Sequence, residues 1–201
     1  MAKRGPEPFK GSGADIDPAA VVLQRPECAA LIGAIAVEWV HMETVLARIY
    51  SYLVNGVNPF GRDLGEVIAA ESFDLVPSLQ VKRTILLAAA RRRFDNDLVD
   101  RFAGLLKQYQ EAATKRNDII HGTWLLSDEY PDKLIWSKPI TQFAKARVYG
   151  VVDFKAILES IEQVAKQFDA LFRDEMSPIL EAAFKVDLLW LADAQNVKDS
   201  N

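Results

Sequence analysis

Apolar residues at helical spacing are the feature that most constrains the fold of this chain. Between Pro26 and the pair Asn55-Gly56 they recur at steps of four and seven positions, which places them on one face of an α-helix. The positions are Leu31, Ile35, Met42, Ile49 and Leu53. The pattern predicts one long helix of about 28 residues that ends at the turn-forming residues Asn55 to Pro59.

The same spacing predicts further helices along the chain. A shorter helix is expected over 64–72, and another from Pro77, a favourable first-turn residue, to Arg93. Asp95 or Asn96 would cap a long helix that stops at Gly122, where glycine can adopt the left-handed terminating conformation. Two more are expected, one capped by Asp153 and running through Phe172, the other opened by Ser177-Pro178 and running through Trp190.

The period changes between residues 123 and 149. Segments 123–127 (Thr-Trp-Leu-Leu-Ser) and 134–137 (Leu-Ile-Trp-Ser) are rich in aromatic and branched residues and flank a turn-forming centre at 128–133. This arrangement is typical of a β-hairpin, and a third extended piece is expected within 144–149. The fold class is therefore predicted to be mainly α, a bundle of five to six helices with a small β-hairpin insertion.

Composition indicates a single domain with short tails. The chain has 201 residues, half of them apolar, which is enough to bury a core without disulfides. Residues 1–17 contain Gly5, Pro6, Pro8, Gly11 and Gly13 and few large apolar side chains, so they are expected to form a flexible or loosely docked arm. Residues 18–195 would then form the helical domain and 196–201 a tail.

The rare residue types exclude several kinds of site. One cysteine, Cys28, excludes an internal disulfide, and with only two histidines, His41 and His121, a metal centre is not expected. No cofactor is expected either. There is no run of about 18 uncharged apolar residues and no hydrophobic stretch behind the first basic residues, so we expect a cytoplasmic protein with no membrane segment.

Charge is unevenly distributed along the chain. The net charge is −4, but residues 82–147 hold 13 Lys and Arg against 8 Asp and Glu, a balance of +5, which leaves −9 for the rest (11 against 20). A broadly basic protein that coats nucleic acid is excluded. A local anion site in the middle of the chain stays open, beside the alternative that these charges form an ordinary solvated face.

The segment 115–124, Lys-Arg-Asn-Asp-Ile-Ile-His-Gly-Thr-Trp, carries the most chemistry. His121 would end a long helix, where the exposed carbonyls favour the protonated imidazole, and such a group suits general acid–base catalysis. Arg116 lies on an otherwise apolar stripe with Tyr109 and Ile119, so it needs an anion, either a protein carboxylate or a ligand phosphate.

Glu43 is the candidate internal partner for Arg116. It interrupts the apolar face formed by Trp39, Leu46 and Tyr50 in the first long helix. A buried Glu43–Arg116 pair would explain both residues structurally, and the same carboxylate could equally orient the arginine in a site. On an ideal helix Arg116 and His121 point about 140° apart, so they converge on one ligand only if the helix end distorts or a second subunit contributes its own copy.

The arrangement Arg116-Asn117 followed by His121, with the histidine closing a helix in a mainly α protein, resembles the HEPN superfamily. Trp39 and Glu43 in the first long helix and the His-Gly ending are similar to a bacterial HEPN-like subgroup. The resemblance extends over roughly residues 30–175 in helix order and hairpin position. It implies a helical bundle that forms a homodimer, with two motifs facing each other across a cleft.

In active HEPN members that cleft is a metal-independent endoribonuclease of toxin or defence type. The resemblance would make His121 the general acid or base and Arg116 the stabiliser of the charged transition state, with Asn117 orienting substrate or histidine. Lys115 and Trp124 would contact RNA, and Glu43 would support Arg116. Members neutralised by a nucleotidyltransferase antitoxin have a tyrosine where this chain has Thr123, so a partner of that kind is not expected, although another antitoxin or operon partner stays open.

The alternatives are a dimer that binds nucleotide or RNA without cutting it, and a purely structural motif in which His121 complements the helix dipole. Other residues have simpler explanations. His41 is expected to be a structural or surface histidine and Cys28 buried filler. Arg91, Arg92 and Arg93 are expected to cap a helix, and Trp124 and Trp136 to cover a core rather than stack on bases. The apolar segment 186–191 belongs to a last core helix or to a dimer surface.

Overall fold

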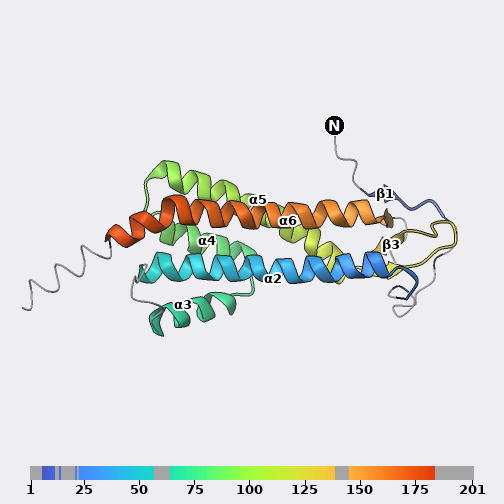
Figure 1. Ribbon diagram of the computed structural model, residues 1–201, viewed down its shortest axis with the longest axis horizontal. Helices are drawn as coiled ribbons and strands as arrows, with labels where there is room; N and C mark the ends of the chain where they lie inside the picture. Colours follow the sequence, from blue (N-terminus) through green and yellow to red (C-terminus); the bar gives the residue numbers. More distant parts are fainter. Residues whose placement is uncertain are drawn as a thin grey trace, which may run out of the picture. The chain divides into compact units, whose positions relative to one another are not determined.

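The computed structural model describes residues 6–11, 14, 21, 23–56, 64–138 and 145–183. Its described helices are α2 (Pro26–Asn55), α3 (Leu64–Asp74), α4 (Leu79–Ala90), α5 (Asn96–His121) and α6 (Val151–Leu171) (Figure 1). The strands are β1 (Glu7–Pro8), β2 (Thr123–Leu125), β3 (Leu134–Ser137) and β4 (Arg147–Tyr149). The protein is thus mainly helical with a small antiparallel sheet, which confirms the predicted fold class at this level.

The chain divides into two compact units. Unit 1 contains Met1–His41 and Tyr109–Gln163, and unit 2 contains Met42–Gln108 and Val164–Asn201. Helices α2, α5 and α6 each contribute one segment to each unit. The four strands belong to unit 1, whereas α3 and α4 belong to unit 2.

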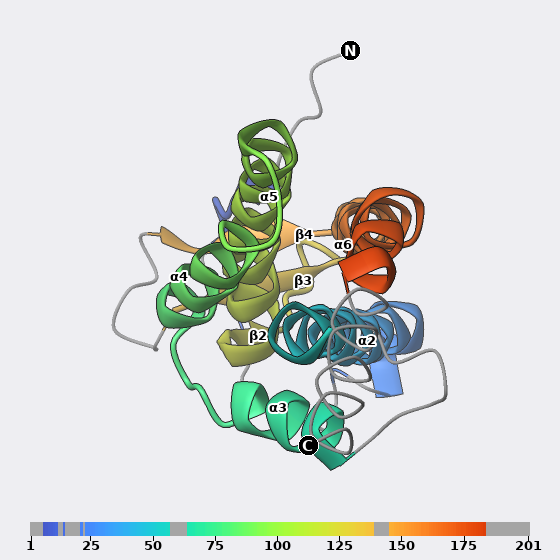
Figure 2. The same cartoon turned by 90° about the vertical axis from the view of Figure 1, so that its left-hand side faces the viewer.

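The sheet of unit 1 is built on the predicted hairpin. Strands β2 and β3 pair antiparallel with Trp124 opposite Trp136, and β4 pairs with β3 as the third extended piece that the sequence indicated (Figure 2). A fourth strand comes from the N-terminal segment, because β1 pairs antiparallel with β4, giving the order β1-β4-β3-β2. The segment predicted to be a loose arm is therefore docked at Glu7–Pro8.

A backbone hydrogen bond and side-chain packing also hold the N-terminal segment against the sheet. The backbone N–H of Phe9 donates to the carbonyl of Ala146 at 2.9 Å, one residue beyond the paired strand. The Phe9 ring lies 5.8 Å from the ring of Tyr130, and both pack against the buried side chains of Leu125 and Ile135. Burial of these apolar groups offsets part of the entropy lost when the segment is ordered.

Helix α6 begins differently from the sequence prediction. It starts at Val151, and Asp153 lies in its first turn, where its Oδ2 accepts a hydrogen bond from the backbone N–H of Gly150 at 2.8 Å. Asp153 therefore occupies the third helical position and bonds back to the residue before the helix, as the acidic residue of a capping box does. The prediction that Asp153 is itself the N-cap was wrong by three residues, because the N-cap position is that of Gly150.

The core of unit 2 is aromatic. Phe102 of α5 and Phe168 of α6 are fully buried and meet edge to face, with ring centroids 6.0 Å apart and planes at 81°. Phe73 of α3 is also buried and stacks on Tyr50 of α2 at 4.9 Å. Such pairs contribute about 0.5–1.5 kcal/mol beyond the burial of their area, and here each one joins two different helices.

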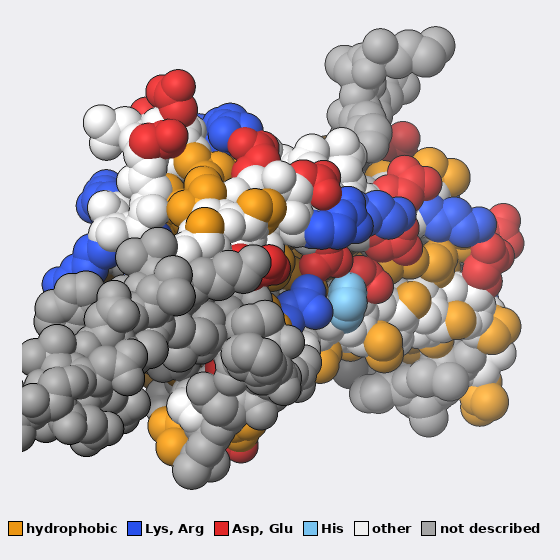
Figure 3. All heavy atoms as spheres, turned by 60° about the vertical axis from the view of Figure 1, so that its left-hand side comes forward, with side chains coloured by type: hydrophobic (Ala, Val, Ile, Leu, Met, Phe, Trp, Pro, Cys, Tyr) orange, Lys and Arg blue, Asp and Glu red, His pale blue; other side chains and the backbone are white. Residues whose placement is uncertain are grey.

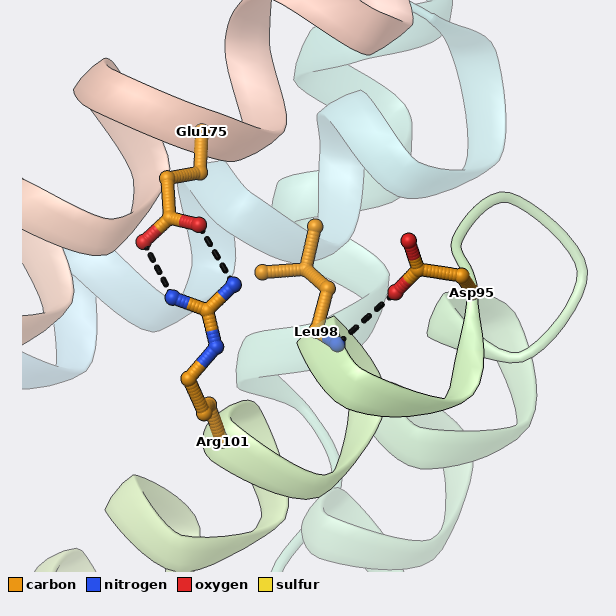
Figure 4. A network of polar contacts seen from close by, with 4 residues as sticks. All are labelled: Asp95, Leu98, Arg101 and Glu175. Atoms are coloured by element: carbon orange, nitrogen blue, oxygen red, sulfur yellow. Dashed lines mark hydrogen bonds and ion pairs between the residues drawn. The ribbon is translucent and has the colours of Figure 1, made fainter.

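Two helices of unit 2 have identifiable caps. The Ser78 hydroxyl accepts from the backbone N–H of Val81, so α4 begins after Ser78 and the predicted role of Pro77 as first-turn residue was wrong. Asp95 caps α5 as predicted, because its Oδ1 accepts from the backbone N–H of Leu98 at 2.9 Å (Figure 4). One turn further along, Arg101 forms a two-pronged ion pair with Glu175.

The end of α6 also differs from expectation. Instead of a new helix that opens at Ser177-Pro178, the chain continues from Leu171 through a π-helical segment, Phe172–Met176, into helical residues 177–183. Tyr52 of α2 stacks on Phe172 at 5.2 Å at the start of this segment. Trp190 and the apolar segment 186–191 lie outside the described residues.

Among the described helices, α2 is long and apolar enough to cross a membrane by length and composition alone. The core helix of a soluble protein passes the same test, and α2 buries Ile35, Met42 and Leu46 completely within the protein.

The Asp95 cap generates a stability prediction. Asp95→Ala removes the acceptor for the Leu98 N–H and should lower the free energy of unfolding by about 1 kcal/mol, whereas Asp95→Ser should retain most of the stability. Urea denaturation followed by far-UV circular dichroism measures both variants. Asp100→Ala, an exposed acidic residue of the same helix, is the matched control and should cost less than about 0.5 kcal/mol. Equal losses for Asp95→Ala and Asp100→Ala would contradict the cap.

Candidate functional site

The motif Arg116-Asn117 with His121 lies at the C-terminal end of α5, entirely within unit 1. The helix stays α-helical through His121, its last residue. A continuous helix preserves the ideal spacing of 100° per residue, so Arg116 and His121 point about 140° apart. The helix end is therefore not distorted in a way that would bring Arg116 and His121 together.

Two tryptophans of the hairpin hold the end of α5. The indole Nε1–H of Trp124 donates to the carbonyl of Ile119 at 3.0 Å, and that of Trp136 donates to the carbonyl of Asp118. The last four carbonyls of a helix have no partner within the helix, and these are two of them. Because Trp124 and Trp136 are cross-strand neighbours, the register of the hairpin fixes the helix end that carries the motif.

Gly122 is required for this contact, for a reason other than the one predicted. Its φ is not positive; among the described residues, Gly56 after α2 is the glycine with a left-handed φ, at 80°. A Cβ at Gly122 would lie 1.9 Å from Nε1 of Trp136 and 2.6 Å from the carbonyl oxygen of Asp118. Glycine is therefore needed because the Trp136 indole crosses directly over the backbone at this position.

Trp124 is packed within an aromatic group. Its ring meets Tyr149 edge to face at 5.4 Å and lies 5.3 Å from Phe154. Burial raises the pKa of the Tyr149 phenol above its ordinary value, so this hydroxyl stays neutral at physiological pH. Since the Trp124 ring contacts these side chains and its N–H bonds to Ile119, the geometry favours a role in packing over the predicted contact with RNA.

Arg116 lies on an aromatic platform. Its guanidinium carbon is 5.7 Å from the ring centroid of Trp39, which is buried and stacks nearly parallel on Tyr109 at 5.0 Å. Nη1 of Arg116 donates to Oδ1 of Asn117 at 3.0 Å. Nε of Arg116 is buried and has no hydrogen-bond acceptor among the described residues. The cation is thus held by a ring and a neutral amide, and no described carboxylate forms an ion pair with it.

Glu43, the candidate partner of Arg116, has a basic neighbour within its own unit. It belongs to unit 2, where its Oε1 lies 3.9 Å from Nζ of Lys82, a buried lysine whose ammonium also lies over the Phe73 ring at 5.1 Å. The sequence did not predict this contact with Lys82, because helix periodicity identifies a face but not the residue packed against it. The carboxylate compensates Lys82 instead.

The other motif residues are open to solvent. His121, Asn117 and Lys115 are exposed, whereas Arg116 is half-buried. Asn117 and His121 are four residues apart and share a face of the helix. The structure thus brings Asn117 together with Arg116 by a hydrogen bond and with His121 by helical spacing. It does not bring Arg116 and His121 together within one chain.

The surroundings of the motif are of mixed charge. Oδ1 of Asp118 lies 3.4 Å from Nζ of Lys138, whose ammonium is 5.9 Å from the Trp136 ring. Figure 3 shows a face of the molecule on which basic and acidic side chains are interspersed with exposed hydrophobic ones.

The remaining candidates are unlike catalytic groups. His41 is exposed on α2, and Cys28 is buried, with the pKa of its thiol raised by that burial, so its reactive thiolate form is disfavoured. Within the described residues no group of three or more His, Cys, Asp and Glu side chains is arranged to hold a metal ion.

The sequence interpretation missed the platform under Arg116. Trp39 was assigned to an apolar face and Tyr109 to the Arg116 stripe, but their stacking was not predicted. A signal was present: Tyr109 and Arg116 are seven residues apart, two turns of helix, so they lie on one face and contact the same partner.

No protein-family model, curated protein or solved structure matches this chain. The site is therefore interpreted from its own geometry.

The crossing of Trp136 over Gly122 generates a prediction. Gly122→Ala should lower the free energy of unfolding by about 1–3 kcal/mol, because the added methyl group overlaps both the indole and the Asp118 carbonyl. Gly104→Ala is the matched control, since a Cβ at this position in the middle of α5 meets nothing within 4 Å and alanine is the better helix former. Thermal and urea denaturation compare the two, and a Gly122→Ala protein as stable as the Gly104→Ala protein would contradict the tryptophan cap.

Proposed function

We propose that this protein is a metal-independent endoribonuclease of toxin or defence type that acts at a cleft between two copies of the chain. The observation that carries the proposal is the half-buried guanidinium of Arg116, which rests on Trp39 and has no described carboxylate partner. A cation withdrawn from water in this way favours the approach of an anion, and guanidinium geometry suits phosphate. The exposed imidazole of His121 on the same helix end supplies a group for proton transfer.

In the proposed reaction His121 takes the proton of a ribose 2′-hydroxyl. The 2′-oxygen then attacks the adjacent phosphorus, and the bond from phosphorus to the 5′-oxygen of the next nucleotide breaks. The leaving 5′-oxygen takes up a proton from water, and His121 later returns the proton that it has accepted to the solvent. The products are a 2′,3′-cyclic phosphate and a 5′-hydroxyl, and no metal is needed because protons and charge are handled by side chains.

Arg116 stabilises the negative charge that accumulates on the phosphate oxygens during this reaction. Asn117, bonded to Arg116 and on the face of His121, orients one or the other. Lys115 is exposed and adds a contact to the RNA backbone. Trp124 is left out of the proposed substrate contacts because its ring and N–H are engaged inside unit 1, and Glu43 is left out as a support because it pairs with Lys82.

The helix geometry supports the proposal of a homodimer. One continuous helix directs Arg116 and His121 about 140° apart, so a second copy is needed to place one chain's histidine near the other's arginine. Unit 1 also exposes apolar side chains on α2, with Val37 72% and Val40 61% accessible. Exposed apolar residues at helical spacing favour a covered surface, and we assign that surface to the second copy. RNA as substrate implies action in the cytoplasm.

The same guanidinium supports a second candidate function, the binding of nucleotide or RNA without cleavage. Binding needs Arg116 and Lys115 but not a proton-transfer group. If the protein is a toxin, its antitoxin is of another kind than a nucleotidyltransferase, because Thr123 has no phenol to accept a nucleotide in the way that a tyrosine does.

The first test is cleavage of a mixed RNA substrate in excess EDTA. The purified protein should produce fragments with 2′,3′-cyclic phosphate ends. His121→Ala and Arg116→Ala should each lower the rate by about 100-fold or more, the loss expected for a general acid–base group or a transition-state donor. His41→Ala, which removes the other exposed histidine, should cleave at the normal rate. If the wild-type protein binds RNA tightly but leaves it uncut, the second candidate function, binding without cleavage, is favoured over the endoribonuclease.

The second test addresses the shared cleft. His121→Ala and Arg116→Ala proteins, each inactive alone, are mixed, partially unfolded and refolded together so that subunits exchange. A mixed dimer has one histidine and one arginine that face each other from different chains, and part of the activity should return. Light scattering after size exclusion confirms that dimers have formed. Dimers that exchange but stay inactive would contradict a cleft built from both copies.

A further inference from the structure

Unit 2 contains an open cavity of about 440 Å³ that is remote in sequence from the motif. Its walls come from the last turns of α2, with Tyr50 and Leu53, and from the C-terminal half of α4, with Ile85 and Ala88. Sites for small organic ligands in proteins measure roughly 300–1,000 Å³ and are mostly apolar with a few polar groups. The volume and the apolar walls of this cavity fall within that description.

The polar groups of the cavity are cationic. Arg92 and Arg93 line it, and the described lining contains no acidic residue. Arg93 donates from Nε to the carbonyl of Leu53 at 3.1 Å and from Nη2 to that of Val54 at 3.2 Å. These bonds cap the C-terminal end of α2, whose last turn has no basic residue of its own, and they join the two walls of the cavity.

Arg92 is exposed, and its side chain forms no hydrogen bond or ion pair with any described residue. Arg91 beside it is exposed as well. The cavity therefore combines one arginine that fixes its shape with a second that is available to a ligand. Guanidinium groups suit carboxylate and phosphate because they offer paired donors.

An apolar stripe leads away from Arg92 along α4. Val81, Ile85 and Ala88 follow each other at steps of four and three residues, so they share one face of α4, and Arg92 lies in the turn just beyond the helix. Val81 is 48% accessible, and Val54 on the opposite wall is 44% accessible. At 1.5 Å per residue the stripe is about 16 Å long, which matches an extended aliphatic chain with its charged end at Arg92.

We propose that this cavity binds an amphipathic organic anion, with the carboxylate or phosphate head at Arg92 and the apolar body on the stripe that includes Ile85 and Ala88. The argument combines the charge complementarity of the rim with the apolar surface next to it. The site lies wholly in unit 2 and is independent of the ribonuclease proposal.

Isothermal titration calorimetry of the full chain tests the site with three probes: octyl phosphate below its micelle concentration, inorganic phosphate and octanol. Octyl phosphate should bind at least tenfold more tightly than either other probe, because it alone satisfies both the arginine and the apolar walls. Arg92→Gln should weaken octyl phosphate binding about tenfold, the loss expected for one charge-assisted hydrogen bond. Ala88→Trp, a substitution at an exposed helical position, should fill the cavity and abolish binding.

Lys107→Gln, which removes an exposed positive charge from α5 in the same unit, is the matched control and should leave the affinity unchanged. Circular dichroism verifies that each variant is folded. The proposal is overturned if octyl phosphate does not bind at millimolar concentration, if inorganic phosphate binds equally well, or if Arg92→Gln and Ala88→Trp bind octyl phosphate as the wild type does.

Discussion

The geometry of the candidate site depends on the two indole hydrogen bonds that close the C-terminal end of α5. A helix end leaves carbonyls that must be paired or solvated, and here Trp124 and Trp136 pair those of Ile119 and Asp118. Both donors belong to one cross-strand pair, so a slip of either strand by one residue would turn the ring of that strand to the other face of the sheet and separate the pair. The hairpin thus orients the end of the helix, and this fixes the direction in which the exposed His121 points.

A balance of solvation energies explains why Arg116 is poised for an anion. Partial burial removes water from the guanidinium, and the Trp39 ring returns only part of the lost energy, since cation–π contacts contribute about 0.5–2 kcal/mol. Asn117 supplies a neutral acceptor for one nitrogen, while Nε has none among the described residues. A phosphate oxygen would supply both the charge and the missing acceptor. The stacking of Trp39 on Tyr109 keeps the platform rigid, so the guanidinium loses little freedom when an anion arrives.

The sequence predicted the parts of the structure that depend on residues close together in the chain. It did not predict the parts that depend on contacts between distant residues. Helix α2 and the hairpin were predictable because periodicity and turn residues are local signals. Strand β1 was not, because the two residues Glu7–Pro8 carry no pattern and are ordered by pairing with β4, about 140 positions away. The partner of Glu43 was missed for the same reason, since the choice of Lys82 is made by tertiary packing. Gly122 was recognised as a helix terminator, yet the cause is the Trp136 ring above it, which no dihedral preference reveals.

The distribution of charge distinguishes two ways of binding an anion. Affinity for a nucleic-acid backbone rises with the number of phosphates that basic residues neutralise, and a chain with a net charge of −4 is poorly suited to that mode. Arg116 and Arg92 instead lie beside apolar surface, Trp39 in one unit and the α4 stripe in the other. Next to such surface the effective dielectric constant is lower and each charge interacts more strongly with its ligand than it would in open water. A few well-placed arginines can therefore select an anion on an acidic protein, and both proposed sites rely on the position of an arginine rather than on total charge.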